Sequence, residues 1–345
     1  MRIVVAMSGG VDSSVVAGLM ARAGHEVIGI TLQLYDHGAA IGRKGACCAG
    51  ADIRDAKRVA ATLGIAHYVI DAEQKFRESV ISAFADSYAA GQTPVPCIAC
   101  NQHLKFGDLL TMARDLGAEA LATGHYVRRV ETPDGAQLHQ AADTARDQSW
   151  FLFATTRAQL EFCRFPLGDI ASKAEVRALA AQMGLATADK PDSQDICFVP
   201  SGSYAQIVEK FRPDALAAGE LVTAAGEIVG THQGIARYTI GQARRLGDSA
   251  QGQVVQRIDP ATRRITIGPR SGGTREINLR ELNWLCPAPV APLRIATKLR
   301  ARDSLHPATV TADGALTLDE PALAAPGQAA VFYAGTRILG GGFIV

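Results

Sequence analysis

No stretch of the 345-residue sequence approaches the roughly 18 consecutive apolar residues that a membrane-spanning helix needs. Residues 1–6 read as a short strand and lack the length and flanks of a signal peptide. The sequence also lacks convincing repeats and low-complexity segments. With 48% hydrophobic and 20% charged residues it suits a globular protein of two or three domains. We therefore expect a cytoplasmic protein with no membrane partner.

The sequence has almost no net charge, at +1, so it is not basic as a whole. The distribution is uneven. Residues 1–200 contain 19 Lys and Arg against 22 Asp and Glu, whereas residues 237–302 contain 13 basic and 4 acidic residues, a balance of +9. A basic stretch of this kind suits a polyanion such as RNA. A solvated surface gives the same pattern, so charge alone leaves both interpretations open.

The cysteines do not form an even set that would suit a disulfide framework. There are seven, at positions 47, 48, 97, 100, 163, 197 and 286. We expect some of these thiols to be chemically active. For Cys163 and Cys286, each isolated in the sequence, the expected role is that of a small buried hydrophobic residue.

Strand and helix patterns alternate along the first half of the chain. Apolar strands at residues 3–6, 27–32 and 120–122 alternate with helical spacing, and Ser172 to Glu175 form a capping box for a helix ending at Gly184. This alternation predicts an α/β fold, with a doubly wound parallel sheet covered by helices on both faces.

The pattern changes after about residue 201, where turn signals separate short β-rich segments. Residues 309–310 and 315–318 flank Asp313-Gly314 as in a hairpin. We expect small β domains here, with a barrel at the C-terminal end.

A glycine-rich loop, Met7-Ser-Gly-Gly-Val-Asp-Ser13, follows the first strand and precedes a helix. It lacks both the lysine of a P-loop and the G-x-G-x-x-G spacing. Glycines let the backbone approach a phosphate, and the helix N-terminus adds N–H groups and partial positive charge. Ser8 and Ser13 add hydroxyl donors, and Asp12 is a candidate Mg²⁺ ligand. We expect this loop to be surface-exposed, so that the variants Asp12→Asn and Gly9→Val should both still fold.

The alternative for this loop is an ordinary tight turn before a helix, but six matching positions in a strand–loop–helix context weigh against it. The loop resembles that of the ATP pyrophosphatases, which bind the pyrophosphate of ATP and adenylate an oxygen. This predicts ATP and a reaction class, and leaves the substrate open.

Cys97 and Cys100 follow a proline-containing stretch, residues 91–96, that should be extended. We expect Cys100 at or near the first turn of the next helix, where the helix dipole lowers a thiol pKa, and Lys105 lies one turn further on. Cys197 lies 97 residues after Cys100, in the segment 192–198.

Three interpretations of these cysteines remain open. Cys97 and Cys100 with Cys47-Cys48 form a candidate zinc site. Cys97 and Cys100 alone form a candidate thioredoxin-type redox pair. In the third, one thiol carries a persulfide and another releases its sulfur.

The whole chain, residues 1–345, resembles the bacterial tRNA-specific 2-thiouridylases, which belong to the adenine nucleotide alpha hydrolase-like (PP-loop) superfamily. Six segments carry the resemblance, and together they are specific to that family: Ser8–Ser13, 122–127, 147–152, 192–198, the pair 232–234 and 238–242, and the pair 327–333 and 340–342. The resemblance implies a PP-loop domain at 1–203, a central domain at 204–278 and a β-barrel domain at 279–345.

The resemblance also implies roles for individual residues. Cys100 matches the nucleophile and Cys197 the cysteine that takes up the persulfide. The ATP-binding positions are Ala6, Met7, Ser8, Gly9, Gly10, Val11, Asp12, Ser13, Leu32 and Gly124. The segment around the target base is Val95, Pro96 and Cys97. The tRNA contacts are His125, Arg146, Asp147, Gln148, Arg300, Ala301 and Gln328.

Three positions depart from the family pattern. Val95 stands where the family has Asn, so an amide contact to the base is absent. Some members have Asp at the position of Cys97, which puts an acid–base role there in doubt. Leu32 falls where Met is common and should still pack on adenine.

The implied activity is ATP-dependent 2-thiouridine synthesis in tRNA, with adenylation of the wobble-uridine oxygen and then sulfur transfer from a cysteine persulfide. The implied partners are tRNA and a persulfide-donor protein, with ATP and Mg²⁺ as cofactors. Two alternatives are a synthetase of the same superfamily acting on a small metabolite, and a zinc-stabilised RNA-binding module without catalysis.

The segment 294–302 places Lys298, Arg300 and Arg302 at every second position. On a strand these three side chains would share one face and contact tRNA phosphates, while Ile295 and Leu299 would face a barrel core. An ordinary amphipathic strand with a solvated face is the alternative.

Overall fold

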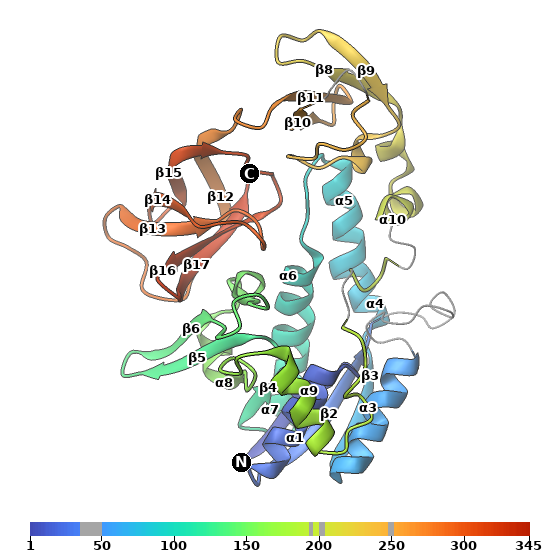
Figure 1. Cartoon of the computed structure of the whole chain (residues 1–345), viewed down its shortest axis with the longest axis vertical. Coiled ribbons are helices and arrows are strands. Elements are labelled where there is room, and N and C mark those ends of the chain that lie inside the picture. Colours follow the sequence, from blue (N-terminus) through green and yellow to red (C-terminus); the bar gives the residue numbers. More distant parts are fainter. Residues whose placement is uncertain (35–49, 193–195, 200–203, 248–251) are drawn as a thin grey trace. The chain divides into compact units, whose positions relative to one another are not determined.

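A computed structural model describes residues 1–34, 50–192, 196–199, 204–247 and 252–345 (Figure 1). The chain divides into two compact units. Unit 1 comprises residues 1–80, 97–202 and 336–338, and unit 2 comprises residues 81–96, 203–335 and 339–345. Each unit is described by itself below.

Within the described part of unit 1, a five-stranded sheet has the order β3-β2-β1-β4-β7 and only parallel pairings. Its strands are β1 (Arg2–Ala6), β2 (Glu26–Gln33), β3 (Ala66–Asp71), β4 (Ala120–Ala122) and β7 (Cys163–Arg164). The predicted parallel α/β sheet is confirmed.

Helices cover this sheet because their apolar faces pack on its alternating side chains. Ile3 and Val5 of β1 join a core cluster with Val15 and Val16 of α1, whereas Val4 points to the opposite face. Apart from the helix that follows residue 95, the helices of the described residues that begin in unit 1 are α1 (Val11–Arg22), α3 (Gly50–Leu63), α4 (Glu73–Phe76), η1 (Arg77–Ser82), η3 (Ser149–Leu152), α8 (Arg157–Phe162) and α9 (Lys173–Gln182).

The ends of α9 lie where the sequence predicts them, and the structure shows the Ser172 half of the predicted capping box. The Ser172 side chain accepts a hydrogen bond of 3.3 Å from the Glu175 main-chain N–H, which satisfies one of the unpaired donors at the helix start. Gly184 has a φ of +66°, the left-handed conformation that ends a helix.

A helix follows directly on the proline-containing stretch, as the sequence predicts. It starts with α6 (Pro96–Cys100) and continues through the π-helical segment η2 (Asn101–Leu109) into α7 (Leu110–Asp115). Pro96 is the first helical residue, a position that suits proline because no helix partner is available there for an N–H.

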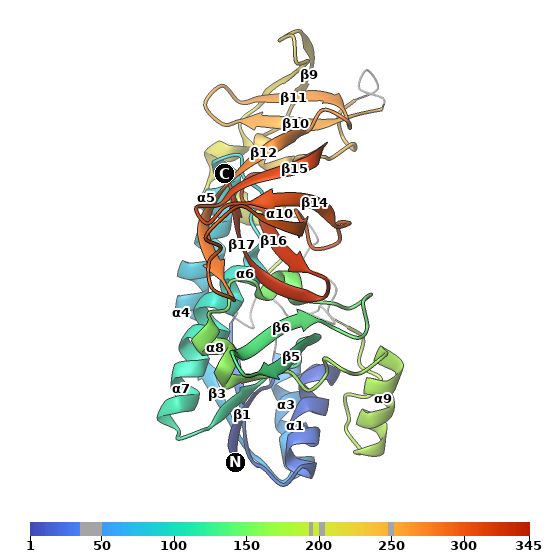
Figure 2. The ribbon, with the colours of Figure 1, turned by 90° about the vertical axis from the view of Figure 1, so that its left-hand side faces the viewer.

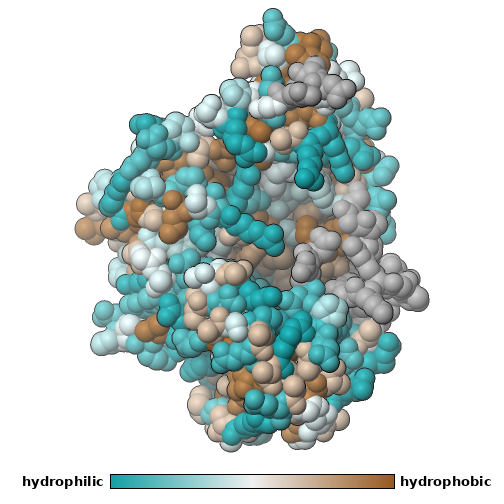
Figure 3. All heavy atoms as spheres, viewed as in Figure 1, coloured by the Kyte–Doolittle hydropathy of each residue, from teal (hydrophilic) through white to brown (hydrophobic). Residues whose placement is uncertain are grey.

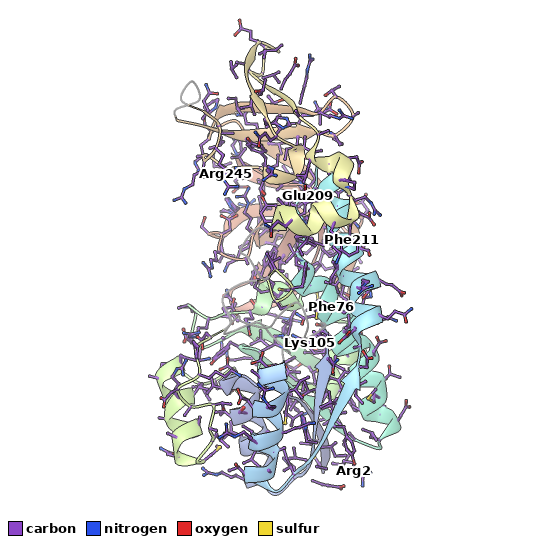
Figure 4. All side chains as sticks on the ribbon, turned by 90° about the vertical axis from the view of Figure 1, so that its right-hand side faces the viewer. Arg2, Phe76, Lys105, Glu209, Phe211 and Arg245 are labelled. Carbon is purple, nitrogen blue, oxygen red and sulfur yellow. The ribbon has the colours of Figure 1, made fainter. Side chains whose placement is uncertain are left out.

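Two further features of unit 1 lie near this helix or beside the sheet. The Nζ of Lys75 in α4 lies 3.7 Å from a carboxylate oxygen of Asp108 in η2. Figure 4 labels one further residue on each of these helices, Phe76 on α4 and Lys105 on η2. An antiparallel hairpin is formed by β5 (Val127–Thr132) and β6 (Gly135–Gln140) (Figure 2).

The central part of unit 2 contains a sheet of order β10-β11-β8-β9. Its strands are β8 (Gly219–Val222), β9 (Ile228–His232), β10 (Gln253–Asp259) and β11 (Arg264–Pro269). Val255, Ile265 and Ile267 are buried in its core with Tyr238 and Ile240. The helices of this unit are α5 (Ala83–Ala89), α10 (Tyr204–Phe211), η4 (Pro213–Leu216) and η5 (Ile235–Arg237).

The C-terminal part of the chain forms a closed barrel of six strands, all in described residues, with the order β12-β15-β14-β13-β16-β17. Its strands are β12 (Thr274–Trp284), β13 (Leu293–Lys298), β14 (His306–Val310), β15 (Ala315–Ala322), β16 (Ala329–Ala334) and β17 (Arg337–Ile344). Pairing of Leu279 with Ile344 closes the barrel. The predicted barrel is confirmed, as is the hairpin around Asp313-Gly314.

The predicted strand 294–302 is only partly right. Ile295 and Leu299 are buried in the barrel core as expected, but β13 ends at Lys298. Arg300 and Arg302 therefore lie beyond the strand, and the alternation that would align them with Lys298 does not extend to them.

No helix of the described residues is long and apolar enough to cross a membrane. On the face drawn in Figure 3, hydrophobic residues are scattered among hydrophilic ones.

Candidate nucleotide and thiol site

The glycine-rich loop lies between the end of β1 and the start of α1 and is held in a fixed shape. Gly9 has a φ of +78°, which favours glycine, and Gly10 is extended. The main-chain N–H of Met7 donates to the oxygen of Ile30, at 2.8 Å, and the oxygen of Met7 accepts from the Thr31 hydroxyl at 2.6 Å.

Ser13 organises the loop from within. Its hydroxyl accepts from the main-chain N–H of Ser8 at 3.1 Å and donates to the main-chain oxygen of Gly10 at 3.2 Å. The Ser8 side chain is exposed and lies 3.3 Å from the Ser13 hydroxyl. Of the two hydroxyls, that of Ser8 is therefore the one more accessible to a ligand.

Gly124 lies against the loop from the neighbouring strand. The chain leaves β1 for β2 on one side and has β4 on the other, so the loop lies where the strand order reverses. A β-carbon on Gly124 would come within 3.0 Å of the Ser13 main-chain nitrogen and 3.1 Å of the Asp12 β-carbon. This close approach explains glycine at a predicted ATP-binding position.

Gly9 is buried, which contradicts the expectation of an exposed loop at this position. A β-carbon there would overlap the main-chain carbonyl of Asp52, in the first turn of α3. Gly9→Val therefore cannot be accommodated unless α3 moves.

Asp12, in the first turn of α1, binds a lysine. The ammonium of Lys173 lies 2.7 Å and 2.8 Å from the two Asp12 carboxylate oxygens, and the Tyr126 hydroxyl donates to the first of them at 2.6 Å. The Lys173 side chain is 8% exposed. Burial, followed by the hydrogen bond and charge of Asp12, raises the pKa of Tyr126, so the phenol remains a donor.

Lys173 is shared with a second carboxylate, Asp192, at 2.9 Å. Asp192 also accepts from Arg146 at 2.8 Å and from Arg177 at 3.3 Å. Burial acts to raise the pKa of Asp192, but the hydrogen bonds and charges of Lys173 and then Arg146 outweigh it and lower that pKa. Asp192 is therefore a carboxylate at neutral pH. We call the connected side chains of Asp12, Tyr126, Lys173 and Asp192 the loop cluster. Asp192 links the segment before Cys197 to this cluster.

Lys190 holds the loop from the other side. Its ammonium donates to the main-chain oxygen of Gly9 at 3.0 Å and pairs with Asp52 at 2.6 Å and Asp55 at 2.5 Å. Burial acts to lower the pKa of Lys190, but the hydrogen bonds to Asp52 and Asp55 outweigh it and raise that pKa.

These contacts do not fit a resident Mg²⁺ at Asp12. Both Asp12 oxygens already accept from Lys173, and among the described residues no group of three or more His, Cys, Asp and Glu side chains is placed to hold a metal ion. An ion on Asp12 would have to share the carboxylate with the buried lysine.

Cys100 is buried, and Cys97 is exposed. Because the helix begins at Pro96, Cys97 lies in its first turn and Cys100 is the last residue of α6. Cys100, the fifth residue of this helix, therefore lies near its first turn, as the sequence predicts. Asn101, the residue after Cys100, is buried and its side-chain amide donates to the main-chain oxygen of Phe151 at 3.2 Å, which fixes this turn.

Cys197 is half-buried and is positioned by the residue that follows it. Phe198 is buried, and its ring packs edge-on against Phe76 with centroids 5.7 Å apart. The Val199 main-chain N–H donates to the oxygen of Ile196 at 3.0 Å, which forms a turn around Cys197. Both Cys100 and Cys197 belong to unit 1.

The other cysteines differ in environment. Cys163 is fully buried, and burial raises its pKa to about 12, so it stays a neutral thiol. Cys286 is half-buried, and its thiol donates to the main-chain oxygen of Leu339 at 3.6 Å. The candidate zinc ligands Cys47 and Cys48 lie outside the described residues.

Thr93, two residues before the predicted target-base segment Val95 to Cys97, makes hydrogen bonds within unit 2. The Thr93 main-chain N–H donates to the oxygen of Pro326 at 2.7 Å, and the Thr93 oxygen accepts from the side-chain amide of Gln328 at 3.0 Å. Gln328, a predicted tRNA contact, thus has an internal partner. Val95 is half-buried.

His125, another predicted tRNA contact, is buried between Phe106 and Phe165. Its Nδ1 lies 2.8 Å from the Thr123 hydroxyl. Burial, together with the charge of Lys105, lowers its pKa well below the usual range, so the ring is neutral at pH 7. A tRNA contact through His125 would have to use a neutral ring.

The predicted tRNA contacts Arg146, Asp147 and Gln148 also bind within unit 1. Asp147 accepts from the Ala141 main-chain N–H at 3.0 Å and from the Ser149 hydroxyl at 2.7 Å. The side-chain oxygen of Gln148 accepts from the Tyr126 main-chain N–H at 2.9 Å. The Gln148 bond holds the main chain of Tyr126, whose hydroxyl donates to Asp12, so this segment also supports the loop.

Arg300 has an internal partner in unit 2. Its guanidinium donates to the main-chain oxygen of Ile240 at 2.9 Å, next to Gly241, where a β-carbon would come within 3.0 Å of it. Burial lowers the pKa of Arg300. Ala301 is half-buried and Arg302 is exposed. Of this group, Arg302 is the one most available to RNA.

Comparison with known proteins adds what geometry alone cannot supply. The family model described as the tRNA methyl transferase HUP domain matches residues 1–201, more than half of the chain. The model described as the tRNA methyl transferase PRC-barrel domain matches residues 206–269, and the model described as the aminomethyltransferase β-barrel domain matches residues 274–344. These spans lie near the expected divisions at 203 and 278, which remain a prediction.

Curated relatives match along their full length. The chain is 68% identical to the tRNA-specific 2-thiouridylase MnmA of Acidiphilium cryptum, with 100% of both chains covered. It is 60% identical to that of Gluconobacter oxydans, with 100% of this chain and 99% of the other covered. The chain belongs to the tRNA-specific 2-thiouridylase family.

The description of the HUP-domain model as a methyl transferase differs from the names of these relatives. The PRC-barrel model has the same wording, but each family model covers one domain, whereas the relatives match the whole chain at high identity. We therefore name the family after the relatives. Among solved structures, a 4-thiouridine synthetase–RNA complex with bound ATP is similar over 62% of this chain and 50% of that one, with 16% identity and a TM-score of 0.40. That likeness is too distant to argue function from.

Sequence reasoning about this 2-thiouridylase-family chain missed four residues that shape the loop: Tyr126, Lys173, Lys190 and Asp52. One signal was available. Lys173 is the first residue of a capped helix, where the helix dipole disfavours a cation. A lysine in that position needs a carboxylate partner, and the sequence alone does not identify Asp12 as that partner.

Proposed function

We propose that this protein converts a uridine of tRNA to 2-thiouridine, using ATP to activate the base and a cysteine persulfide to supply sulfur. The observation that carries the proposal is the full-length 68% identity to a tRNA-specific 2-thiouridylase. Two arrangements in unit 1 support it, namely the glycine loop at the strand-order reversal and the placement of Cys100 and Cys197 in the same unit. The proposed place of action is the cytoplasm.

In the proposed first step, the uracil O2 attacks the α-phosphorus of ATP, pyrophosphate leaves, and the base becomes adenylated at O2. Adenylation converts a poor oxygen leaving group into AMP. The loop from Ala6 to Ser13, with Leu32 and Gly124, would hold the nucleotide. We assign no step to a Mg²⁺ ion at Asp12, because Lys173 occupies that carboxylate. A Mg²⁺ that accompanies the nucleotide would be held by its phosphates.

In the proposed second step, Cys197 carries the persulfide, loaded by a donor protein, and its terminal sulfur becomes bonded to C2 of the uracil while AMP leaves. Two routes are open. In the first, the terminal sulfur attacks C2 and displaces AMP, and the Cys100 thiolate then attacks the Cys197 sulfur, which breaks the S–S bond and leaves the terminal sulfur on C2. In the second, the Cys100 thiolate first attacks the Cys197 sulfur and releases the terminal sulfur as hydrosulfide, which then attacks C2 and displaces AMP. Both routes leave a Cys100–Cys197 disulfide, so two electrons from an external thiol must reduce it before the next turnover.

The target base would have to leave the anticodon loop stack to reach the thiols. The proposed base-side segment is Val95, Pro96 and Cys97. Proposed tRNA contacts are His125, Arg146 to Gln148, Arg300, Ala301 and Gln328. Most of these side chains also bind partners within the protein, so they would help to shape the tRNA-binding surface as well as contact the tRNA.

The decisive experiment combines purified protein, ATP, unmodified tRNA and a persulfide-loaded donor. We expect tRNA-dependent release of AMP and pyrophosphate, and 2-thiouridine among the nucleosides by mass spectrometry. Pyrophosphate release that needs a small metabolite instead of tRNA would support the synthetase alternative. Tight tRNA binding with bound zinc and no pyrophosphate release would support the RNA-binding module.

A further inference from the structure

Lys173 is the most unusual charged residue of the loop cluster. It is the first residue of α9, where the helix dipole opposes a positive charge, and its side chain is 8% exposed. Burying an ammonium costs free energy that only close partners offset. The two carboxylates of Asp12 and Asp192 supply these partners, at 2.7 Å and 2.9 Å.

The loop itself offers a phosphate no cation. Its seven residues from Met7 to Ser13 include one charged side chain, the carboxylate of Asp12, in the first turn of α1. A carboxylate at that point repels a polyphosphate unless a cation stands beside it. Lys173 contacts both Asp12 oxygens and therefore stands at this point.

The contacts of Asp192 keep Lys173 in place from the other side. Arg146 and Arg177 both donate to Asp192, so its orientation does not depend on Lys173 alone. Asp12 is likewise held by the Tyr126 hydroxyl. An ammonium has three donors, so Lys173 can turn one of them to a phosphate oxygen and retain a carboxylate partner.

We propose that Lys173 contacts the phosphates of the nucleotide and supplies the cation that the glycine loop lacks, with Asp12 and Asp192 as positioning residues. The inference rests on the proposed use of ATP. It gives Asp12 a role different from metal binding. The rival explanation is purely structural, with Lys173 needed only to neutralise two carboxylates.

The test compares dissociation constants of the full-length protein for ATP, inorganic pyrophosphate and adenosine by calorimetry. Lys173→Met should weaken ATP and pyrophosphate binding by about 10- to 100-fold, the loss expected for a charge-assisted hydrogen bond, and leave adenosine binding unchanged. Lys57→Met is the matched control, because Lys57 is exposed on α3, and it should bind all three ligands as the wild type does.

Two further variants separate positioning from neutralisation. Lys173→Arg keeps the charge and should retain part of the preference for ATP over adenosine. Asp192→Asn removes one holder and should weaken ATP binding less than Lys173→Met does. If Lys173→Met fails to fold, the ATP-to-adenosine ratio of Lys173→Arg and Asp192→Asn decides.

Wild-type ATP and pyrophosphate affinity in Lys173→Met would overturn the proposal. Equal losses for ATP and adenosine would also overturn it, because a structural role affects both ligands. The proposed function can fail independently. A wild-type protein that binds ATP through Lys173 but never thiolates tRNA would refute the function and leave this inference standing.

Discussion

The ammonium of Lys190 donates a hydrogen bond of 3.0 Å to the main-chain oxygen of Gly9, in the turn of the glycine loop. The same ammonium pairs with Asp52 and Asp55 of α3. Gly9 also packs on the Asp52 backbone. One lysine thus joins the loop to the start of α3, and the loop depends on a residue 181 positions away in the sequence.

Lys190→Met should lower the free energy of unfolding by about 2–3 kcal/mol, because it leaves the buried Asp52 carboxylate without its partner. The measurement is urea denaturation, with the midpoint and slope compared with those of the wild type. Lys190→Met combined with Asp52→Asn should recover part of the loss. A midpoint unchanged in the single variant would show that the contacts of Lys190 with Gly9, Asp52 and Asp55 contribute nothing to stability.

The sheet could be predicted because its signals are local. Apolar strands such as residues 3–6 are bounded by glycines and polar residues, and the Ser172–Glu175 cap marks α9 within the four residues that form it. The error at β13 is also local in origin. Alternation in residues 294–302 continues past the point where the strand ends, and only the bond from Arg300 to Ile240, 60 residues away, reveals the departure.

The place of the loop between a strand and a helix was predictable, the roles of the cysteines remain predictions, and the charged partners of the loop could not be predicted. A glycine loop has a sequence signature, whereas the partners of Asp12 come from residues 114 and 161 positions further along the chain. No spacing rule connects them. The Mg²⁺ expectation for Asp12 arose because an isolated carboxylate near phosphate suggests a metal, and Lys173 could not be placed beside it from the sequence.

We expect the described cysteines other than Cys97 to differ in their importance for the reaction. Cys100→Ser and Cys197→Ser should each abolish 2-thiouridine formation and leave ATP affinity within about twofold, because neither thiol is placed in the glycine loop. Cys286→Ser should retain activity. For Cys163, which is fully buried, Cys163→Ala is the suitable control because it buries no hydroxyl.

Single-turnover thiolation with nucleoside mass spectrometry measures these activities. Full activity in Cys197→Ser would contradict the persulfide role assigned to it. Loss of activity in a folded Cys163→Ala protein would show that the buried thiol takes part in the reaction.

The buried His125 should make stability depend on pH. Burial lowers its pKa in the folded protein, so below about pH 6.5 the unfolded chain binds a proton that the folded chain does not. Stability should therefore fall as the pH decreases from about 6.5, by up to about 1.4 kcal/mol per pH unit from this group. It should be fully retained above that pH.

The measurement is the free energy of unfolding between pH 5 and pH 8 for the wild type and His125→Phe. The variant loses the bond to Thr123, which lowers its free energy of unfolding by the same amount at every pH. It also lacks the titrating ring, so its free energy of unfolding should not fall with His125 protonation. The difference between the two curves should change below about pH 6.5. Parallel curves would mean that His125 titrates normally in the folded protein and is accessible to water.

The basic residues around the end of β13 should divide into structural and RNA-binding groups. Arg300→Ala should lower the free energy of unfolding by about 1–2 kcal/mol, since it removes a charged donor from the Ile240 carbonyl. Arg302→Ala should not, because Arg302 is exposed.

Lys298→Ala with Arg302→Ala should weaken tRNA binding and reduce its salt dependence by up to about two phosphates' worth of counterion release. Phosphate contacts position an RNA without reading its sequence, so the loss should be similar for different tRNAs. The measurement is tRNA affinity across a salt series, with ATP affinity as the control that should not change. An unchanged salt slope would mean that this part of the barrel does not touch the RNA backbone, and would direct the search to the basic residues between Arg237 and Arg280.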